Sequence, residues 1–204
     1  MIAIIDYGVG NLFSLRSSFA AIGESAVVTS DERVIASAER LILPGVGAFG
    51  DAAELLHSTG LDEVVKSECE KGKPLMGICL GMQLLFTEGL EYGSHRGLDL
   101  IGGVVRPIAE RIEPGLKIPH IGWNALEIKR PDPILKYVAG GDCVYFVHSF
   151  FADTEPGFIS STVDYGGTLT ASVRRDNIWG CQFHPEKSGR VGLNILKAFS
   201  EVQA

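Results

Sequence analysis

The first half of the chain alternates short apolar segments with longer segments whose apolar residues recur at helical spacing. We predict strands at residues 2–6, 25–29, 41–43 and 74–78, and helices at residues 11–22, 31–38, 51–58 and 61–71. The first helix shows the spacing clearly, since Leu12, Leu15 and Phe19 follow Asn11, a residue type that often caps helices. Strands that alternate with helices form β-α-β units, so this half predicts a mainly parallel sheet.

The pattern changes after residue 100. Strand-like segments are predicted at residues 101–106, 125–129, 143–147, 158–163, 169–174 and 178–183, with Gly, Pro and Asp turns between them. A last amphipathic helix is expected after Ser188, which we predict to be its N-cap. The expected fold class is therefore α/β, with an open, mainly parallel sheet flanked by helices and a more antiparallel, β-rich second half.

The amino-acid composition argues against several classes of protein. The 204 residues are 46% hydrophobic, and we expect a single domain over residues 1–204. There are 18 Lys and Arg against 25 Asp and Glu, with no dense basic run, which argues against nucleic-acid binding. No segment reaches the roughly 18 continuous apolar residues of a membrane span, and we expect a cytoplasmic protein. The four cysteines lack paired C-x-x-C spacing, so neither a disulfide framework nor a zinc site is indicated.

The segment Gly77-Ile78-Cys79-Leu80-Gly81 stands where an apolar strand is expected to turn into a helix, predicted to run through residue 86. A G-x-C-x-G pattern at such a junction is typical of a nucleophile elbow, whose glycines permit a tight turn. The helix N-terminus and a nearby imidazolium would favour the thiolate, and the N–H of Leu80 would face a developing oxyanion. A buried core cysteine at an ordinary junction remains the alternative.

His184-Pro185-Glu186 follows the apolar run 178–183 directly. Pro185 ends strand pairing, so His184 is expected at the end of a strand, where Glu186 can hold one imidazole nitrogen. A structural histidine beside a surface acid is the alternative interpretation. His148 is the competing base, but no carboxylate stands two residues after it. The other histidines, His57, His95 and His120, are expected to lack a partner and to be non-catalytic.

Two glycine-containing loops follow other predicted strands. Residues 44–47 could supply a second oxyanion donor, the N–H of Val46, or could form a plain turn. Residues 6–11 look like a phosphate loop but lack the third glycine and the Lys-Ser/Thr pair of nucleotide-binding motifs. We interpret that loop as structural or partner-facing.

Taken together, residues 77–83 and 184–186 resemble the triad class (class I) of glutamine amidotransferases, whose fold is flavodoxin-like. Residues 6–11, 44–50, 119–124, 145–150 and 184–188 are similar to the glutaminase subunits of imidazole glycerol phosphate synthase. This similarity spans nearly the entire chain. It implies an enzyme that hydrolyses glutamine to glutamate and ammonia through a cysteinyl thioester.

The resemblance also implies roles for individual residues. Cys79 matches the nucleophile, His184 the acid–base and Glu186 its orienter, while the amides of Val46 and Leu80 match the oxyanion donors. The positions that match glutamine-binding residues of the family are Gly47, Gln83, Glu91, Ser149 and Phe150. Those that match the interface with the partner are Asn11, Trp123, Tyr145 and Lys187.

In this family the partner is the cyclase subunit HisF, a (β/α)₈ barrel that receives the ammonia and makes imidazole glycerol phosphate for histidine biosynthesis. The chain shows no barrel pattern of its own, so the resemblance implies a heterodimer, with no cofactor and no metal ion. Family glutaminases are weak until the partner binds its ligand, and we expect the 44–47 loop to be the switch. Rival interpretations are a γ-glutamyl hydrolase or peptidase, a glutaminase for another synthase, and a scaffold with a structural cysteine.

Overall fold

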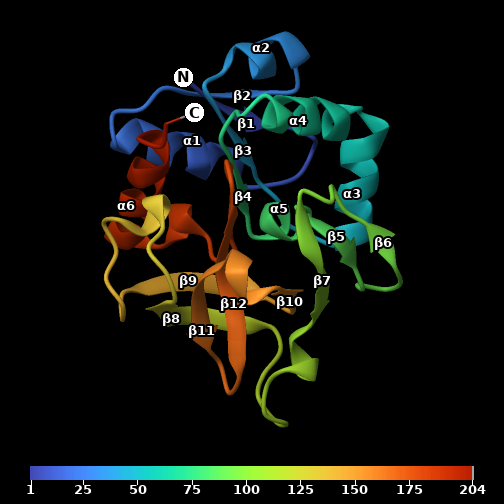
Figure 1. Cartoon of the computed structure of the whole chain (residues 1–204), viewed down its shortest axis with the longest axis vertical. Coiled ribbons are helices and arrows are strands. Elements are labelled where there is room, and N and C mark those ends of the chain that lie inside the picture. The colour runs from blue at the N-terminus through green and yellow to red at the C-terminus, as the bar shows by residue number, and fades with distance from the viewer. Residues whose placement is uncertain (204) are drawn as a thin grey trace.

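The computed structural model describes residues 1–203 and is organised around a nine-stranded sheet in the order β2-β1-β3-β4-β13-β12-β11-β8-β9 (Figure 1). Five neighbouring strands are parallel: β2 (Ala26–Thr29), β1 (Ile2–Ile5), β3 (Arg40–Leu43), β4 (Leu75–Ile78) and β13 (Ile178–Cys181). The other four are antiparallel: β12 (Thr168–Arg175), β11 (Ile159–Asp164), β8 (His120–Ile128) and β9 (Cys143–His148). The predicted α/β class is confirmed, and the sheet is mixed.

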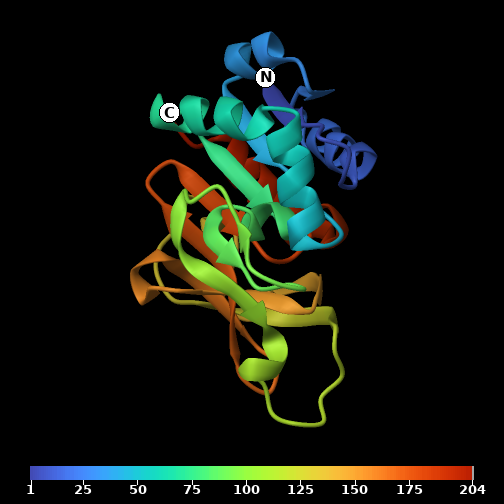
Figure 2. The same ribbon diagram turned by 90° about the vertical axis from the view of Figure 1, so that its right-hand side faces the viewer.

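Helices cover both faces of the parallel strands. On one face lie α1 (Leu12–Ala21) and α6 (Gly189–Ser200), and on the other lie α2 (Glu32–Ser37), α3 (Phe49–Ser58) and α4 (Leu61–Glu70). Along β1, Ile2 and Ile4 pack into the first core and Ala3 and Ile5 into the second. Because both faces are buried, these strands are continuously apolar rather than alternating. Figure 2 shows the antiparallel strands of the second half below this helix-covered part.

A separate four-stranded sheet follows the elbow and was not predicted. It has the order β10-β7-β5-β6, formed by β10 (Phe150–Thr154), β7 (Ile101–Pro107), β5 (Phe86–Gly89) and β6 (His95–Arg96). The predicted helix through residue 86 is wrong, because α5 (Leu80–Gln83) is only one turn long. The carbonyls of Leu84, Leu85 and Phe86 accept hydrogen bonds from the backbone of residues 98–101, which draws the chain into this sheet.

Most predicted helices lie within two residues of the observed ones, and both predicted N-cap residues occupy the N-cap positions, although neither caps its helix through its side chain. Asn11 stands at the N-cap of α1 without a side-chain cap bond. Ser188 stands at the N-cap of α6 as predicted but makes no side-chain cap bond, since its Oγ donates to the His184 carbonyl at 2.6 Å and accepts from Tyr145 N at 2.9 Å. Ser188 therefore fastens the segment 184–188 to β9 instead of capping α6. No helix within residues 1–203 combines the length and apolar character that crossing a membrane requires.

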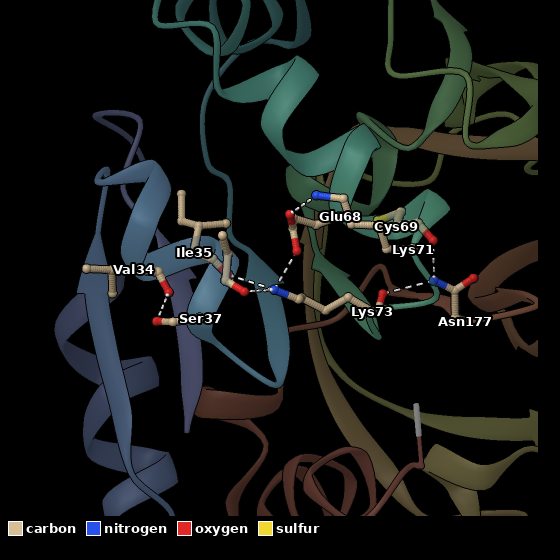
Figure 3. A network of polar contacts seen from close by, with 9 residues as sticks. Val34, Ile35, Ser37, Glu68, Cys69, Lys71, Lys73 and Asn177 are labelled. Atoms are coloured by element: carbon tan, nitrogen blue, oxygen red, sulfur yellow. Dashed lines mark hydrogen bonds and ion pairs between the residues drawn. The ribbon is translucent and has the colours of Figure 1, made fainter.

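The amino ends of the parallel strands are tied together by a polar network, which we call the amino-edge network (Figure 3). Glu68 accepts from Lys71 and Lys73, both at 2.6 Å, and these bonds hold the pKa of its carboxyl group below its usual value. Lys73 also donates to the carbonyls of Ile35 and Ala36 at the end of α2. Asn177, just before β13, donates to the carbonyls of Cys69 and Lys73. The network thus joins α2, α4, β4 and β13.

Candidate active site

Four loops meet at the opposite, carboxyl edge of the parallel strands. They follow β1, β3, β4 and β13, and open α/β sheets bind their ligands at this edge. Strands β4 and β13 are neighbours in register, with Ile78 opposite Cys181, and the N–H of Cys79 donates to the Cys181 carbonyl at 2.7 Å. The two segments that carry Cys79 and His184 therefore leave the sheet side by side.

Cys79 occupies a strained turn between β4 and α5. Its φ of 55° and ψ of −111° place a non-glycine residue in the left-handed half of conformational space, at a cost of about 1–3 kcal/mol. The flanking glycines make the turn possible: a Cβ on Gly81 would overlap the Leu43 carbonyl, and one on Gly77 would overlap the Gly81 carbonyl. The predicted elbow is present.

His184 and Glu186 form a buried pair. His184 Nδ1 lies 2.8 Å from Glu186 Oε1, and the two side chains are 3% and 1% exposed. A carboxylate only accepts, so Nδ1 carries the proton and Nε2 is left for Cys79. Burial acts to lower the pKa of His184, but hydrogen bonds and charge from Cys79 and Glu186 outweigh it and raise the pKa to about 9. The imidazolium is the favoured form.

A cavity of about 320 Å³ opens over Cys79 and His184. Its lining includes every residue predicted for the oxyanion hole and for substrate binding: Val46, Leu80, Gly47, Gln83, Glu91, Ser149 and Phe150. Glu91 is the only acidic side chain in the lining, and its Oε2 accepts from the backbone N–H of Phe49 at 2.7 Å. The structure therefore brings these residues, distant in sequence, to one small site.

His148 also lines this cavity, but both of its ring nitrogens are engaged. Nδ1 donates to the Phe150 carbonyl at 2.8 Å, and Nε2 lies 3.0 Å from Nδ1 of His120. Burial, with the nearby His120 and His184, lowers the pKa of His148 to about 4. It is not placed to accept a proton from Cys79. The expectation that His57 and His120 lack partners is wrong, since His57 pairs with Asp62 and His120 pairs with His148 and Asn124.

Three of the four predicted interface residues form one cluster, which reaches the cavity through Lys187. Trp123 of β8 is 63% exposed and lies opposite Tyr145 of β9, with ring centroids 4.8 Å apart. Lys187 lines the cavity and places its ammonium 5.7 Å from the Tyr145 ring. Asn11 precedes α1, which packs beside the short helix η4 (Pro185–Lys187).

A larger hollow of about 660 Å³ lies elsewhere, between α3, α4 and β6. Its lining includes the His57–Asp62 pair but no cysteine. Within residues 1–203, no three His, Cys, Asp or Glu side chains are grouped so that they could hold a metal ion. The smaller cavity is therefore the candidate active site.

Comparison with known proteins agrees with this geometry. Residues 3–201 match the family model described as glutamine amidotransferase class-I. The imidazole glycerol phosphate synthase subunit HisH of Syntrophotalea carbinolica is 50% identical, over 99% of this chain and 100% of the relative. HisH of Caldanaerobacter subterraneus is 49% identical, over 99% and 98%. The chain belongs to the HisH family of class-I glutamine amidotransferases.

More distant solved structures share the fold of this HisH family member. A crystal structure of a glutamine amidotransferase superposes with a TM-score of 0.75 at 19% identity, covering 98% of this chain and 100% of that one. A structure described as PurLQS from Thermotoga maritima gives a TM-score of 0.74 at 17% identity, with coverage of 98% and 96%. At these identities the likeness shows the fold alone.

Two residues beside the sulfur were missed by sequence reasoning. Gln182 is fully buried, and its Nε2 lies 3.8 Å from Cys79 Sγ. The sequence does carry a signal for Gln182, which is a polar residue inside the apolar run 178–183. Tyr7 is buried and donates its hydroxyl to the Pro44 carbonyl at 2.7 Å, and burial together with the nearby Cys79 raises its pKa. The 6–11 loop of this HisH family member thus packs against the 44–47 loop.

Proposed function

We propose that this chain is the glutamine-hydrolysing subunit of imidazole glycerol phosphate synthase and supplies ammonia for histidine biosynthesis. The observation that carries the proposal is a strained cysteine beside a histidine whose other nitrogen is held by a buried carboxylate. The HisH relatives, about half identical over their full length, support the choice of synthase.

In the first half of the reaction the Cys79 thiolate attacks the side-chain carbonyl carbon of glutamine. The N–H groups of Val46 and Leu80 would stabilise the negative oxygen that forms, and one such donor contributes about 3 kcal/mol to lowering a barrier. The imidazolium of His184 then gives its Nε2 proton to the departing nitrogen. Ammonia leaves and a γ-glutamyl thioester remains on the sulfur.

In the second half a water molecule attacks the thioester and neutral His184 accepts its proton. The carbon–sulfur bond breaks, the electron pair returns to sulfur, and glutamate is released. The carboxylate of Glu186 holds the imidazole in one tautomer and stabilises its cationic form in both halves.

The cavity lining also accounts for recognition of an amino acid. We assign the α-ammonium group to Glu91, and this is supported by Glu91 being the only acidic residue in the lining. Ser149 and Phe150 are suited to the α-carboxylate through hydroxyl and backbone groups, with Gly47 giving the substrate backbone room. The side-chain oxygen of Gln83 can accept from the substrate amide, because its nitrogen is already engaged with Phe150 O and Gln182.

As partner we propose HisF, the (β/α)₈ cyclase, in a heterodimer that forms over Asn11, Trp123, Tyr145 and Lys187. The exposed Trp123 beside Tyr145 and Lys187 supports this face, since aromatic and cationic groups are common in interfaces. We place the switch in the 44–47 loop, where Val46 would present its N–H to the oxyanion only in the active complex. We further propose that the chain is a single domain and works in the cytoplasm.

The test is glutamate release with and without HisF and its nucleotide ligand, followed by reaction with a glutamine-like electrophile and mass spectrometry. We expect partner-dependent glutamate release and a label on Cys79. Replacing the exposed Cys143 with serine serves as the matched control and should change neither result. Peptide cleavage would favour a peptidase, release of glutamate from γ-glutamyl peptides a γ-glutamyl hydrolase, and no turnover with an unlabelled Cys79 a structural cysteine. Equal rates with and without HisF would refute the switch.

A further inference from the structure

Gln182 is a buried residue whose side-chain amide contacts the sulfur of Cys79. It follows β13 directly, has no exposed surface, and its backbone N–H donates to the Ala171 carbonyl at 2.9 Å. Its Nε2 lies 3.8 Å from Sγ of Cys79. It does not line the cavity, so it approaches the sulfur from the protein interior rather than from the substrate side.

The orientation of this amide is determined by its neighbours. The Phe150 carbonyl can only accept, so the group of Gln83 that faces it at 3.2 Å must be the NH₂. The same NH₂ lies 3.0 Å from Gln182, which must therefore present its oxygen to Gln83. The NH₂ of Gln182 is left for the sulfur. One carbonyl thus sets the direction of the whole chain of hydrogen bonds from Phe150 to Cys79.

We propose that Gln182 is a further catalytic residue, which donates an N–H to the sulfur of Cys79, and that Gln83 is a positioning residue that orients this donor. The inference rests on the glutaminase function proposed above. His184 loses its proton during the reaction, whereas a neutral amide cannot take the thiol proton and remains a donor throughout. The bond is strongest when the sulfur is negative, in the attacking thiolate and when the thioester breaks.

The direct test replaces Gln182 with methionine, which removes the donor at nearly constant volume. We expect iodoacetamide to alkylate Cys79 about 10-fold more slowly at neutral pH, relative to the exposed Cys143 of the same molecules. In the complex with HisF, kcat should fall by a similar factor and KM for glutamine should change little, because Gln182 does not line the cavity.

Thr170→Val is the matched control. Thr170 is also buried, lies on the neighbouring strand β12, and donates to the Ala152 carbonyl at 2.7 Å without contacting the sulfur. Its loss should lower the melting temperature but leave the alkylation ratio of Cys79 to Cys143 unchanged. An unchanged ratio in Gln182→Met, or an equal fall in Thr170→Val, would overturn the inference. If wild-type protein still hydrolyses glutamine through Cys79, the proposed function stands even then.

A second measurement needs no change at Gln182. The chain has three glutamines, Gln83, Gln182 and Gln203, so ¹⁵N-glutamine labelling resolves their side-chain amides by NMR. Removing the sulfur by Cys79→Ala should move the Gln182 amide protons upfield, while the exposed Gln203 stays in place. A Gln182 resonance that does not move would show that the amide makes no bond to the sulfur.

Discussion

The two edges of the same parallel strands differ in how completely their buried carboxylates are paired. At the amino edge, the buried Glu68 is paired through both oxygens, with Lys71 and Lys73 (Figure 3). At the carboxyl edge, the buried Glu186 is paired through one oxygen only, and its Oε2 has no hydrogen-bond partner within the described part of the chain. Cys79 adds a strained backbone at that edge, and the favoured state of the buried His184 is the charged one.

Contacts at the amino edge stabilise the fold, whereas features at the carboxyl edge reduce its stability. The amino-edge network satisfies the hydrogen-bonding groups at the ends of helices and strands, and it contains no group poised to react. The carboxyl edge holds strain, an incompletely satisfied carboxylate and a shifted pKa, which are the features expected where a site is preorganised for chemistry. Matched substitutions at the two edges test whether they differ in this way.

The largest expected effect is on activity, from changing one buried cysteine at each edge. Cys79→Ala should lower glutamate release by the proposed complex with HisF at least about 10⁴-fold, because the nucleophile is lost. Cys69→Ala, at the amino edge, should leave the rate per folded molecule unchanged, since burial and the nearby Glu68 raise the pKa of Cys69 to about 12 and keep it a thiol. Comparable losses of glutamate release in both variants would show that the two edges do not differ in reactivity.

Glu186→Gln should lower kcat by about 10²–10⁴-fold with little change in KM. The amide keeps the shape but neither stabilises the imidazolium nor enforces its tautomer. Glu68→Gln is the corresponding change at the amino edge and should reduce the free energy of unfolding without changing kcat. Steady-state glutamate release and urea unfolding measure the two effects, and a Glu186→Gln enzyme within a few-fold of wild type would show that the carboxylate is not needed.

The pH dependence of stability should reflect the raised pKa of His184. A histidine whose folded-state pKa is about 9, against 6.5 for an unperturbed imidazole, stabilises the fold fully below about 6.5 and loses that contribution as the pH rises through about 9. The contribution is at most about 3 kcal/mol. Urea unfolding of wild type and His184→Asn should therefore show a gap that narrows across this window. A gap independent of pH would mean that the imidazolium is not favoured in the fold.

Lys73→Met should lower the free energy of unfolding by about 2 kcal/mol, because its side chain is 11% exposed and its loss leaves Glu68 and two α2 carbonyls short of a donor. Lys71→Met removes the other partner of Glu68, but that side chain is 64% exposed, and the expected loss is below about 1 kcal/mol. Both variants should keep wild-type kcat. Equal losses would show that burial does not decide the strength of these pairs.

The smallest expected effect concerns the backbone. At position 79 glycine should be more stable than alanine by about 1 kcal/mol, because only glycine adopts φ of 55° without strain. At position 69, inside α4, the order should be reversed by about the same amount. Chemical unfolding of Cys79→Gly, Cys79→Ala and the same pair at position 69 measures both. Alanine favoured at both positions would mean that the elbow stores no strain.

The features predicted from sequence were those with a local signal. Glycines around Cys79 and a proline after His184 mark the ends of β4 and β13, and the ends of neighbouring parallel strands meet at one edge. What could not be predicted depends on partners far along the chain. The second sheet needs residues 98–101 to pair with residues 84–86, and the Gln182 amide contacts a sulfur 103 positions away. Periodicity carries no information about such pairings.

Cys79, activated by His184 and Glu186, is proposed to form the bond to glutamine. Rapid quenching of the proposed complex with HisF during turnover of labelled glutamine, followed by peptide mapping, is the most direct test of this bond. We predict a base-labile glutamyl thioester on the peptide that contains Cys79, absent from Cys79→Ala. Turnover without that adduct, or an adduct on Cys69, Cys143 or Cys181 instead, would contradict the account.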